Sequence, residues 1–142
     1  MTTHWNFDRF LDAQADTYSQ AVQELKQGKK RTHWMWFIFP QLFGLGHSET
    51  SKYFSLRSLS EAQAYLNHPI LGQRLLKVCQ ILLDLDTRSA VQIFGSPDNM
   101  KLKSSMTLFS ELKSSKQFDE ILSKYFNGEK DAATLRLLEK TK

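Results

Sequence analysis

The second half of the sequence contains a helical pattern whose apolar face is interrupted by polar side chains. Spaced at i, i+4, i+7, i+11 and i+14, this face consists of Asp98, Leu102, Ser105, Phe109 and Leu112. Burying an unpaired polar group costs about 1–3 kcal/mol, so the carboxylate and the hydroxyl both need partners. In a pocket, Asp98 would act as general base or acid while the Ser105 hydroxyl orients a substrate. We therefore take Asp98 and Ser105 as candidate catalytic residues.

An aromatic segment over residues 34–39 supplies further candidates. It holds four aromatic rings, a methionine and an isoleucine, and His33 and His47 flank it. Imidazole changes its charge near neutral pH, so both histidines are acid–base candidates, and His33 joins the candidate catalytic residues. Indole N–H groups need acceptors and aromatic rings commonly line ligand pockets, so Trp34 and Trp36 are candidate pocket walls.

The remaining candidates would hold an anionic ligand in the same pocket. Lys30 and Lys101 are cations suited to a phosphate group. A glycine-bearing loop, residues 44–46, leads to Ser48, which has the residue type and position of a helix N-cap. The candidate ligand-binding residues are Lys30, Trp34, Trp36, Gln41, Ser48, Lys101, Ser104 and Gln14. A nucleotide or ADP-ribose-like molecule would suit these rings and cations, and the sequence predicts no cofactor.

A structural interpretation explains the same residues without a ligand. Asp98 would interact with the positive end of its helix dipole, and Ser105 would donate to a carbonyl of the preceding turn. Gln14 would tie down a loop. The aromatic segment would fill the core, because large rings bury much apolar surface. Periodicity alone leaves both interpretations open.

Common catalytic and metal-binding motifs do not occur in the sequence. There is no GxSxG, HExxH or CxxC. Cys79 lies beside an apolar stripe, where a thiol behaves as an inert core residue. The histidines at positions 33, 47 and 68 are too scattered to form a recognisable ligand set, so no metal site is predicted.

Length and composition indicate one globular domain over residues 1–142. The chain has 41% hydrophobic and 24% charged residues, which argues against disorder. Its longest apolar run is far shorter than the roughly 20 residues of a membrane span. Neither a signal-peptide pattern nor a cysteine pair is present, so we expect a cytoplasmic protein. The net charge of +4 admits an anionic metabolite or nucleic acid as partner.

Helical periodicity recurs along the whole chain. The first predicted helix begins near Phe7 and stops at Gly28, and Ser58-x-x-Glu61 reads as a capping box. The stripe over residues 71–85 is so wide that we expect a central, largely buried helix. Further helix starts are predicted at Ser48, Ser89, Ser96-Pro97, Ser115 and Asp131. The predicted fold is all-α, a compact domain of about six or seven helices around a central apolar helix.

Four segments of the chain resemble one protein family. They are FDRFLDAQ (7–14), GKKRTHWMWFIFPQLFGLGHS (28–48), EAQAYLNHPILGQRL (61–75) and IFGSPDNMKLKSSMTLF (93–109). They resemble the bacterial domain-of-unknown-function family numbered eighteen hundred and ten, often labelled "calpastatin". The resemblance covers nearly the whole chain and implies an all-helical domain, but no established activity. The label does not fit, because a calpain inhibitor of that type would be disordered and repetitive.

The sequence leaves three functions open. The first is a binding protein or enzyme for a small anionic molecule; at fold level it resembles small helical N-glycosidases of ADP-ribose derivatives, which would make it a hydrolase. The second is a non-catalytic interaction module or homodimer that uses the loop from Trp34 to Ser48. The third, ranked last because basic residues are few, is single-stranded nucleic-acid binding through residues 29–31.

Overall fold

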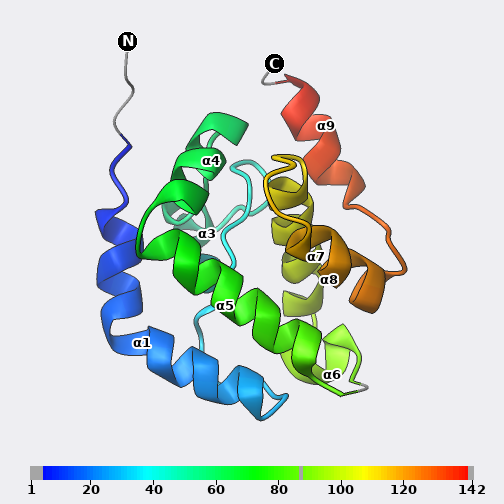
Figure 1. Cartoon of the computed structure of the whole chain (residues 1–142). Helices are drawn as coiled ribbons and strands as arrows, with labels where there is room; N and C mark the ends of the chain where they lie inside the picture. Colours follow the sequence, from blue (N-terminus) through cyan, green and yellow to red (C-terminus); the bar gives the residue numbers. More distant parts are fainter. Residues whose placement is uncertain (1–4, 87, 141–142) are drawn as a thin grey trace.

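Nine helices and one isolated β-bridge form in residues 5–86 and 88–140, which the computed structural model describes (Figure 1). The helices are α1 (Asp8–Lys26), α2 (Met35–Ile38), α3 (Glu49–Tyr53), α4 (Leu59–Asn67), α5 (Leu71–Asp84), α6 (Ala90–Phe94), α7 (Asp98–Ser110), α8 (Gln117–Phe126) and α9 (Ala132–Lys140). The predicted all-α class is confirmed. Nine helices exceed the six or seven predicted; three of them, α2, α3 and α6, are single turns of four or five residues, and α2 had no predicted start.

Helix α1 follows the predicted amphipathic pattern. Its buried face includes Phe10, Gln14, Val22 and Leu25, and it packs against α2 and α5. The chain leaves the helix through Gly28, whose φ of +74° lies in the left-handed region that glycine adopts at little cost. The predicted stop at Gly28 is therefore confirmed.

Helix α5 packs against α1, α4 and α8, and its side chains form much of the core (Figure 1). Only a narrow polar strip of this helix, Gln73, Lys77, Gln80 and Asp84, is exposed. Gly72 allows the close crossing of α4 and α5, because a Cβ there would lie 1.8 Å from the Leu66 carbonyl oxygen.

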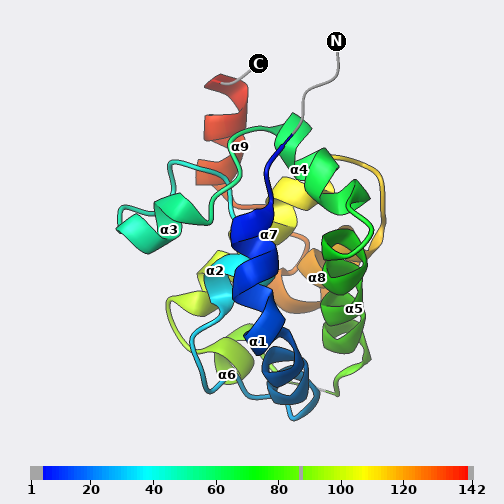
Figure 2. The same ribbon diagram turned by 90° about the vertical axis from the view of Figure 1, so that its left-hand side faces the viewer.

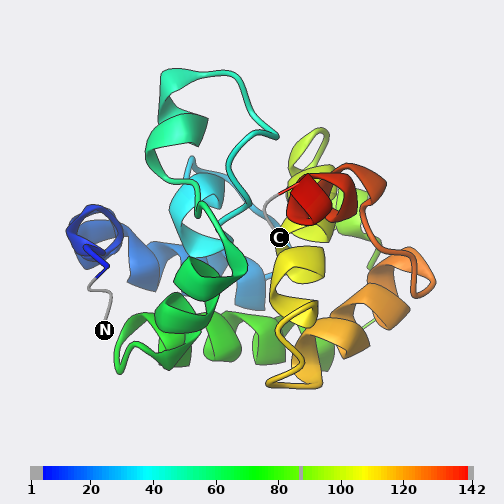
Figure 3. The same ribbon diagram turned by 90° about the horizontal axis from the view of Figure 1, so that it is seen from above.

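Helix α7 is the most enclosed long helix of the described chain. All its residues from Ser104 to Ser110 are buried, and α4, α6, α8 and α9 pack around it (Figure 3). The predicted N-cap at Ser96 is wrong. The first-turn amides of Asn99, Met100 and Lys101 instead donate to backbone carbonyls of Gly95 and Pro97, so no side-chain cap is needed.

The other predicted helix starts are largely correct. The hydroxyls of Ser48, Ser58 and Ser89 each accept the amide expected of an N-cap, and the Asp131 carboxylate accepts the amide of Thr134. Only half of the capping box at Ser58 forms. The Glu61 carboxylate accepts the Arg57 amide and pairs with Arg9 instead of reaching back to Ser58.

The aromatic segment folds into the single turn α2 and is mostly core. The side chains of Trp34, Phe37, Ile38 and Phe39 are all buried. Residues 43–55, which we call the excursion, then carry α3 away from the helical bundle (Figures 2 and 3). A bridge between Leu42 and Leu56 closes the base of this excursion.

No helix of the described residues is both long and apolar enough to cross a bilayer.

Candidate functional site

A pocket of about 320 Å³ lies where the excursion meets α7. Its walls come from α2, from the following loop, from α3 and from the first turn of α7. It is lined by Trp36, Gln41, Leu45, Gly46, His47, Ser48, Ser51 and Lys101. Four of the residues that the sequence singled out for ligand binding thus meet here, although 65 positions separate Trp36 from Lys101 (101 − 36).

Lys101 is the cation of this pocket, and it contacts both an aromatic ring and a carboxylate. Its Nζ lies 4.9 Å from the centroid of the Trp36 ring and 3.2 Å from Oδ1 of Asp98. Oδ2 of Asp98 is 2.9 Å from Nζ of Lys30, whose side chain is nearly buried. Two ammonium groups share one carboxylate, so the cluster of Lys30, Asp98 and Lys101 has a net charge of +1.

The environment of Asp98 keeps it ionised. Burial alone would raise the pKa of Asp98, but the hydrogen bonds and charges of Lys30 and Lys101 outweigh burial and lower it. A carboxylate that is ionised and bound to two ammonium groups is a weak base. The geometry therefore favours a role for Asp98 in holding the two lysines over the predicted role of general base.

Trp34 does not line the pocket. Its ring is fully buried between Phe39 and Phe94, and its indole N–H donates to Oε1 of Glu24 at 2.9 Å. The requirement that the indole find an acceptor is thus met inside the core. This supports the structural interpretation of Trp34, whereas Trp36 keeps part of its surface exposed at the pocket.

Sequence reasoning missed Glu24, which organises the whole turn after α1. Its buried carboxylate accepts five hydrogen bonds, from Gln20, from the Arg31 amide, from the amide and hydroxyl of Thr32, and from Trp34. Burial opposes the charge, but these donors outweigh it and lower the pKa of Glu24 to about 2. Its position three residues after Ala21 and next to Leu25, on the buried face of α1, was the signal that could have identified it.

Ser104 and Ser105 on α7 lie outside the pocket. The Ser104 hydroxyl donates to the Met100 carbonyl one turn earlier, at 3.1 Å. Ser105 is completely buried, and its hydroxyl has no hydrogen-bond partner among the described residues. The structure therefore does not bring Ser105 together with Asp98 at a common cavity.

Gln14 ties down the aromatic segment, as the structural interpretation predicted. Its amide nitrogen donates to the Phe37 carbonyl at 2.7 Å and to the Tyr65 hydroxyl at 3.2 Å. Its amide oxygen accepts from Arg74 at 3.2 Å. Gln14 thus supports α2 from behind and does not line the pocket beside Trp36.

The two histidines beside the aromatic segment differ in position. His33 is exposed and does not line the pocket, whereas His47 does. Ser51, which the sequence did not single out, joins Ser48 there, with the two hydroxyl oxygens 3.0 Å apart. Of the two histidines, His47 is therefore the one placed to act as an acid or a base in the pocket.

Residues suited to metal binding or thiol chemistry do not gather in the described chain. No group of three or more His, Cys, Asp or Glu side chains lies together in residues 5–86 and 88–140. Cys79 is fully buried, its Sγ lies 3.8 Å from Sδ of Met106, and burial raises the pKa of its thiol. A thiol held protonated in this way is a poor nucleophile.

Comparison with known proteins agrees with the resemblance seen in the sequence. The structure is similar to the crystal structure of a conserved hypothetical protein from Mycobacterium tuberculosis, with 47% sequence identity and a TM-score of 0.91. The match covers 93% of this chain and 95% of the other. No match was found among the curated proteins. The model of a family described as a protein of unknown function, DUF1810, matches residues 4–138, so the chain belongs to the DUF1810 family.

Proposed function

We propose that the protein binds a small anionic molecule with a flat ring, of the nucleotide or ADP-ribose class, in the pocket beside Trp36. The observation that carries the proposal is the contact of Lys101 with Trp36 at the wall of this pocket. An aromatic surface for a base and a cation for a phosphate then lie within one ligand's length of each other.

The charge of the cluster supports an anionic ligand. Asp98 neutralises only one of the two lysines that it contacts, so Lys30, Asp98 and Lys101 together retain one positive charge. The Lys101 side chain is 25% exposed, against 8% for Lys30, so Lys101 is the more accessible to a ligand.

The neutral groups of the pocket suit the rest of such a ligand. Gln41 offers both a donor and an acceptor, and the hydroxyls of Ser48 and Ser51 offer hydrogen bonds to a sugar or phosphate. A volume of about 320 Å³ lies at the lower end of the range for small-molecule sites. This size favours a mononucleotide or a sugar phosphate over a complete dinucleotide.

The proposal concerns binding and leaves catalysis aside. The sequence offered Asp98 and His33 as acid–base groups, but Asp98 is bound to two lysines and His33 does not line the pocket. His47 is the residue through which a hydrolytic activity would be sought. A cytoplasmic location is part of the proposal, since nucleotide-class ligands are abundant there.

A binding screen tests the proposal directly. We expect AMP, ADP, ADP-ribose or ribose 5-phosphate to raise the melting temperature, since a ligand at 100 times its Kd adds about 2.7 kcal/mol to the free energy of unfolding. Isothermal titration calorimetry of the best ligand should then show that Lys101→Gln weakens binding about tenfold.

Lys103→Gln is the matched control for that experiment. Lys103 lies on the same helix and is also ion-paired, with Glu129 at 2.8 Å, but it does not line the pocket. This variant should bind the ligand as the wild type does. Equal effects of the two substitutions, or the absence of any stabilising ligand in the screen, would contradict the proposal.

A second candidate function is self-association or protein binding through the excursion. Tyr53 is 60% exposed and Phe43 is 37% exposed, and both belong to it. Light scattering of the purified protein tests this candidate. A dimer that Tyr53→Ser dissociates would support it, and a monomer at every concentration would exclude self-association.

A further inference from the structure

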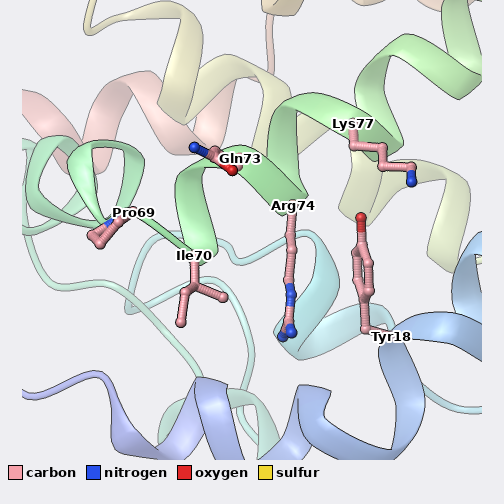
Figure 4. Close-up of a pocket in the computed structure, with 6 residues that line it drawn as sticks. All are labelled: Tyr18, Pro69, Ile70, Gln73, Arg74 and Lys77. Carbon is pink, nitrogen blue, oxygen red and sulfur yellow. The ribbon is translucent and has the colours of Figure 1, made fainter.

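A second hollow, of about 260 Å³, lies between α1 and the first half of α5. It is lined by Tyr18, Pro69, Ile70, Gln73, Arg74 and Lys77. Figure 4 shows Arg74 and the Tyr18 ring side by side in the gap between the two helices, with Lys77 beyond them on α5. None of these residues lines the pocket beside Trp36.

Arg74 is positioned at this hollow by neutral groups. One of its terminal N–H groups donates to the Gln14 amide oxygen at 3.2 Å, and its guanidinium carbon lies 4.7 Å from the centroid of the Tyr18 ring. A guanidinium carries five N–H donors, and Gln14 uses one of them. The side chain is thus preorganised while most of its donors stay available.

The two cations of the hollow lack a carboxylate partner. In residues 5–86 and 88–140, ion pairs form at Arg9, Lys30, Lys101, Lys103 and Lys130, but at neither Arg74 nor Lys77. A partly buried guanidinium without a counter-ion is costly, and a ligand oxyanion would offset that cost.

The backbone amides at the N-terminus of α5 are not the groups that we expect to bind the anion. The first amides of this helix are already bonded, since Nδ1 of His68 accepts from both Ile70 and Leu71. The side chains of Arg74 and Lys77, together with the Tyr18 hydroxyl, supply the donors. Ile70 is 45% exposed beside them and offers an apolar surface.

From this arrangement we infer that the hollow between α1 and α5 binds a small organic oxyanion. Its phosphate or carboxylate group lies on Arg74 and Lys77, and its carbon chain lies on Ile70 and Pro69. Gln14 acts as a positioning residue, because its amide oxygen holds the guanidinium and its amide nitrogen is fixed by the Phe37 carbonyl. Gln14, which the sequence predicted to bind a ligand, thereby gains an indirect role in binding.

Nuclear magnetic resonance titrations locate and classify this binding. The probes are monobutyl phosphate and pentanoate, which pair similar carbon chains with the two kinds of oxyanion. We expect the Arg74 Nε–H and the Lys77 amide resonances to shift while the Trp36 indole resonance stays in place. The tighter of the two probes identifies phosphate or carboxylate as the preferred group.

Two substitutions separate this site from alternatives. Lys77→Gln changes an exposed side chain and should leave the fold intact while weakening the better probe about fivefold or more. Arg74→Lys removes the planar fork and should weaken it further, whereas Lys103→Gln should have no effect. Unchanged affinity in Lys77→Gln and Arg74→Lys, shifts confined to Trp36, or no shift at millimolar probe would overturn the inference.

Discussion

Trp34 and Trp36 are two residues apart and have similar chemical neighbours, yet they lie in different physical settings. Lys30 lies 5.1 Å from the Trp34 ring centroid, and Lys101 lies 4.9 Å from that of Trp36. The two lysines share Asp98. However, Trp34 is fully buried with its indole N–H on Glu24, whereas Trp36 lines a pocket.

This difference shows that a cation over an indole ring does not by itself mark a binding site. The inner pair is Trp34 and Lys30. It connects the turn after α1 to α7 through the ion pair of Lys30 with Asp98, and it leaves no space for a ligand. The outer pair, Trp36 and Lys101, repeats the contact next to a hollow. Access to solvent therefore decides which pair a ligand can use.

Replacing each tryptophan by alanine should show the largest difference between the two settings, measured as a loss of stability. Trp34→Ala removes a fully buried ring and leaves Glu24 without one of its donors, so we expect a loss of about 3–5 kcal/mol in the free energy of unfolding. Trp36→Ala should cost less, about 1–2 kcal/mol, because its ring is only partly buried. Urea denaturation measures both values. Equal losses would contradict the assignment of one ring to the core and the other to a site.

Glu24→Gln should have the next largest effect. The amide keeps the size of the side chain but replaces one acceptor oxygen with a donor, which faces the donors of Arg31, Thr32 or Trp34. We expect a loss of about 1–3 kcal/mol in the free energy of unfolding, measured by urea denaturation.

The pH dependence of stability provides a control for the Glu24 prediction. The pKa of Glu24 is lowered from 4.5 to about 2 in the folded protein, so its charge stabilises the fold above the unfolded value. This contribution is lost as the pH falls from about 4.5 toward about 2. Glu24→Gln should flatten the stability curve in that window. A variant as acid-sensitive as the wild type would refute the account of Glu24.

Asp98→Asn should have the smallest effect on stability. Its carboxylate is partly exposed, so solvent screens its ion pairs, and we expect a loss of about 1 kcal/mol in the free energy of unfolding. The charge of the cluster rises from +1 to +2, so an anionic ligand should bind at least as tightly at low salt. Calorimetry of the variant checks this, and abolished binding would instead make Asp98 part of the binding surface itself.

Helical periodicity predicted most of the fold because it reports the side of a helix that faces the core. It identified α1, α5 and α7 and most caps. It failed at Ser96, where nearby backbone carbonyls satisfy the first-turn amides. The three single turns carry too few residues for a periodic signal, so α2 within the aromatic segment was not predicted.

The site was predicted less completely. Periodicity shows on which face of a helix a side chain lies, but not how far along the helix or how deep in the protein it lies. Asp98 and Ser105 share one face of α7, but seven residues correspond to about 10 Å along a helix. Asp98 therefore lies near the rim with the lysines, while Ser105 is in the core. The pocket also depends on Trp36 meeting Lys101, a long-range contact that no local pattern encodes.

Resonances of the indole N–H groups test the central claim most directly. The isotope-labelled protein would be titrated with AMP and with ADP-ribose while the signals of Trp34 and Trp36 are followed. We predict that the Trp36 signal moves with saturation while the Trp34 signal, bonded to Glu24 in the core, stays in place. Movement of Trp34 as large as that of Trp36, or no movement of Trp36 at millimolar ligand, would contradict the account.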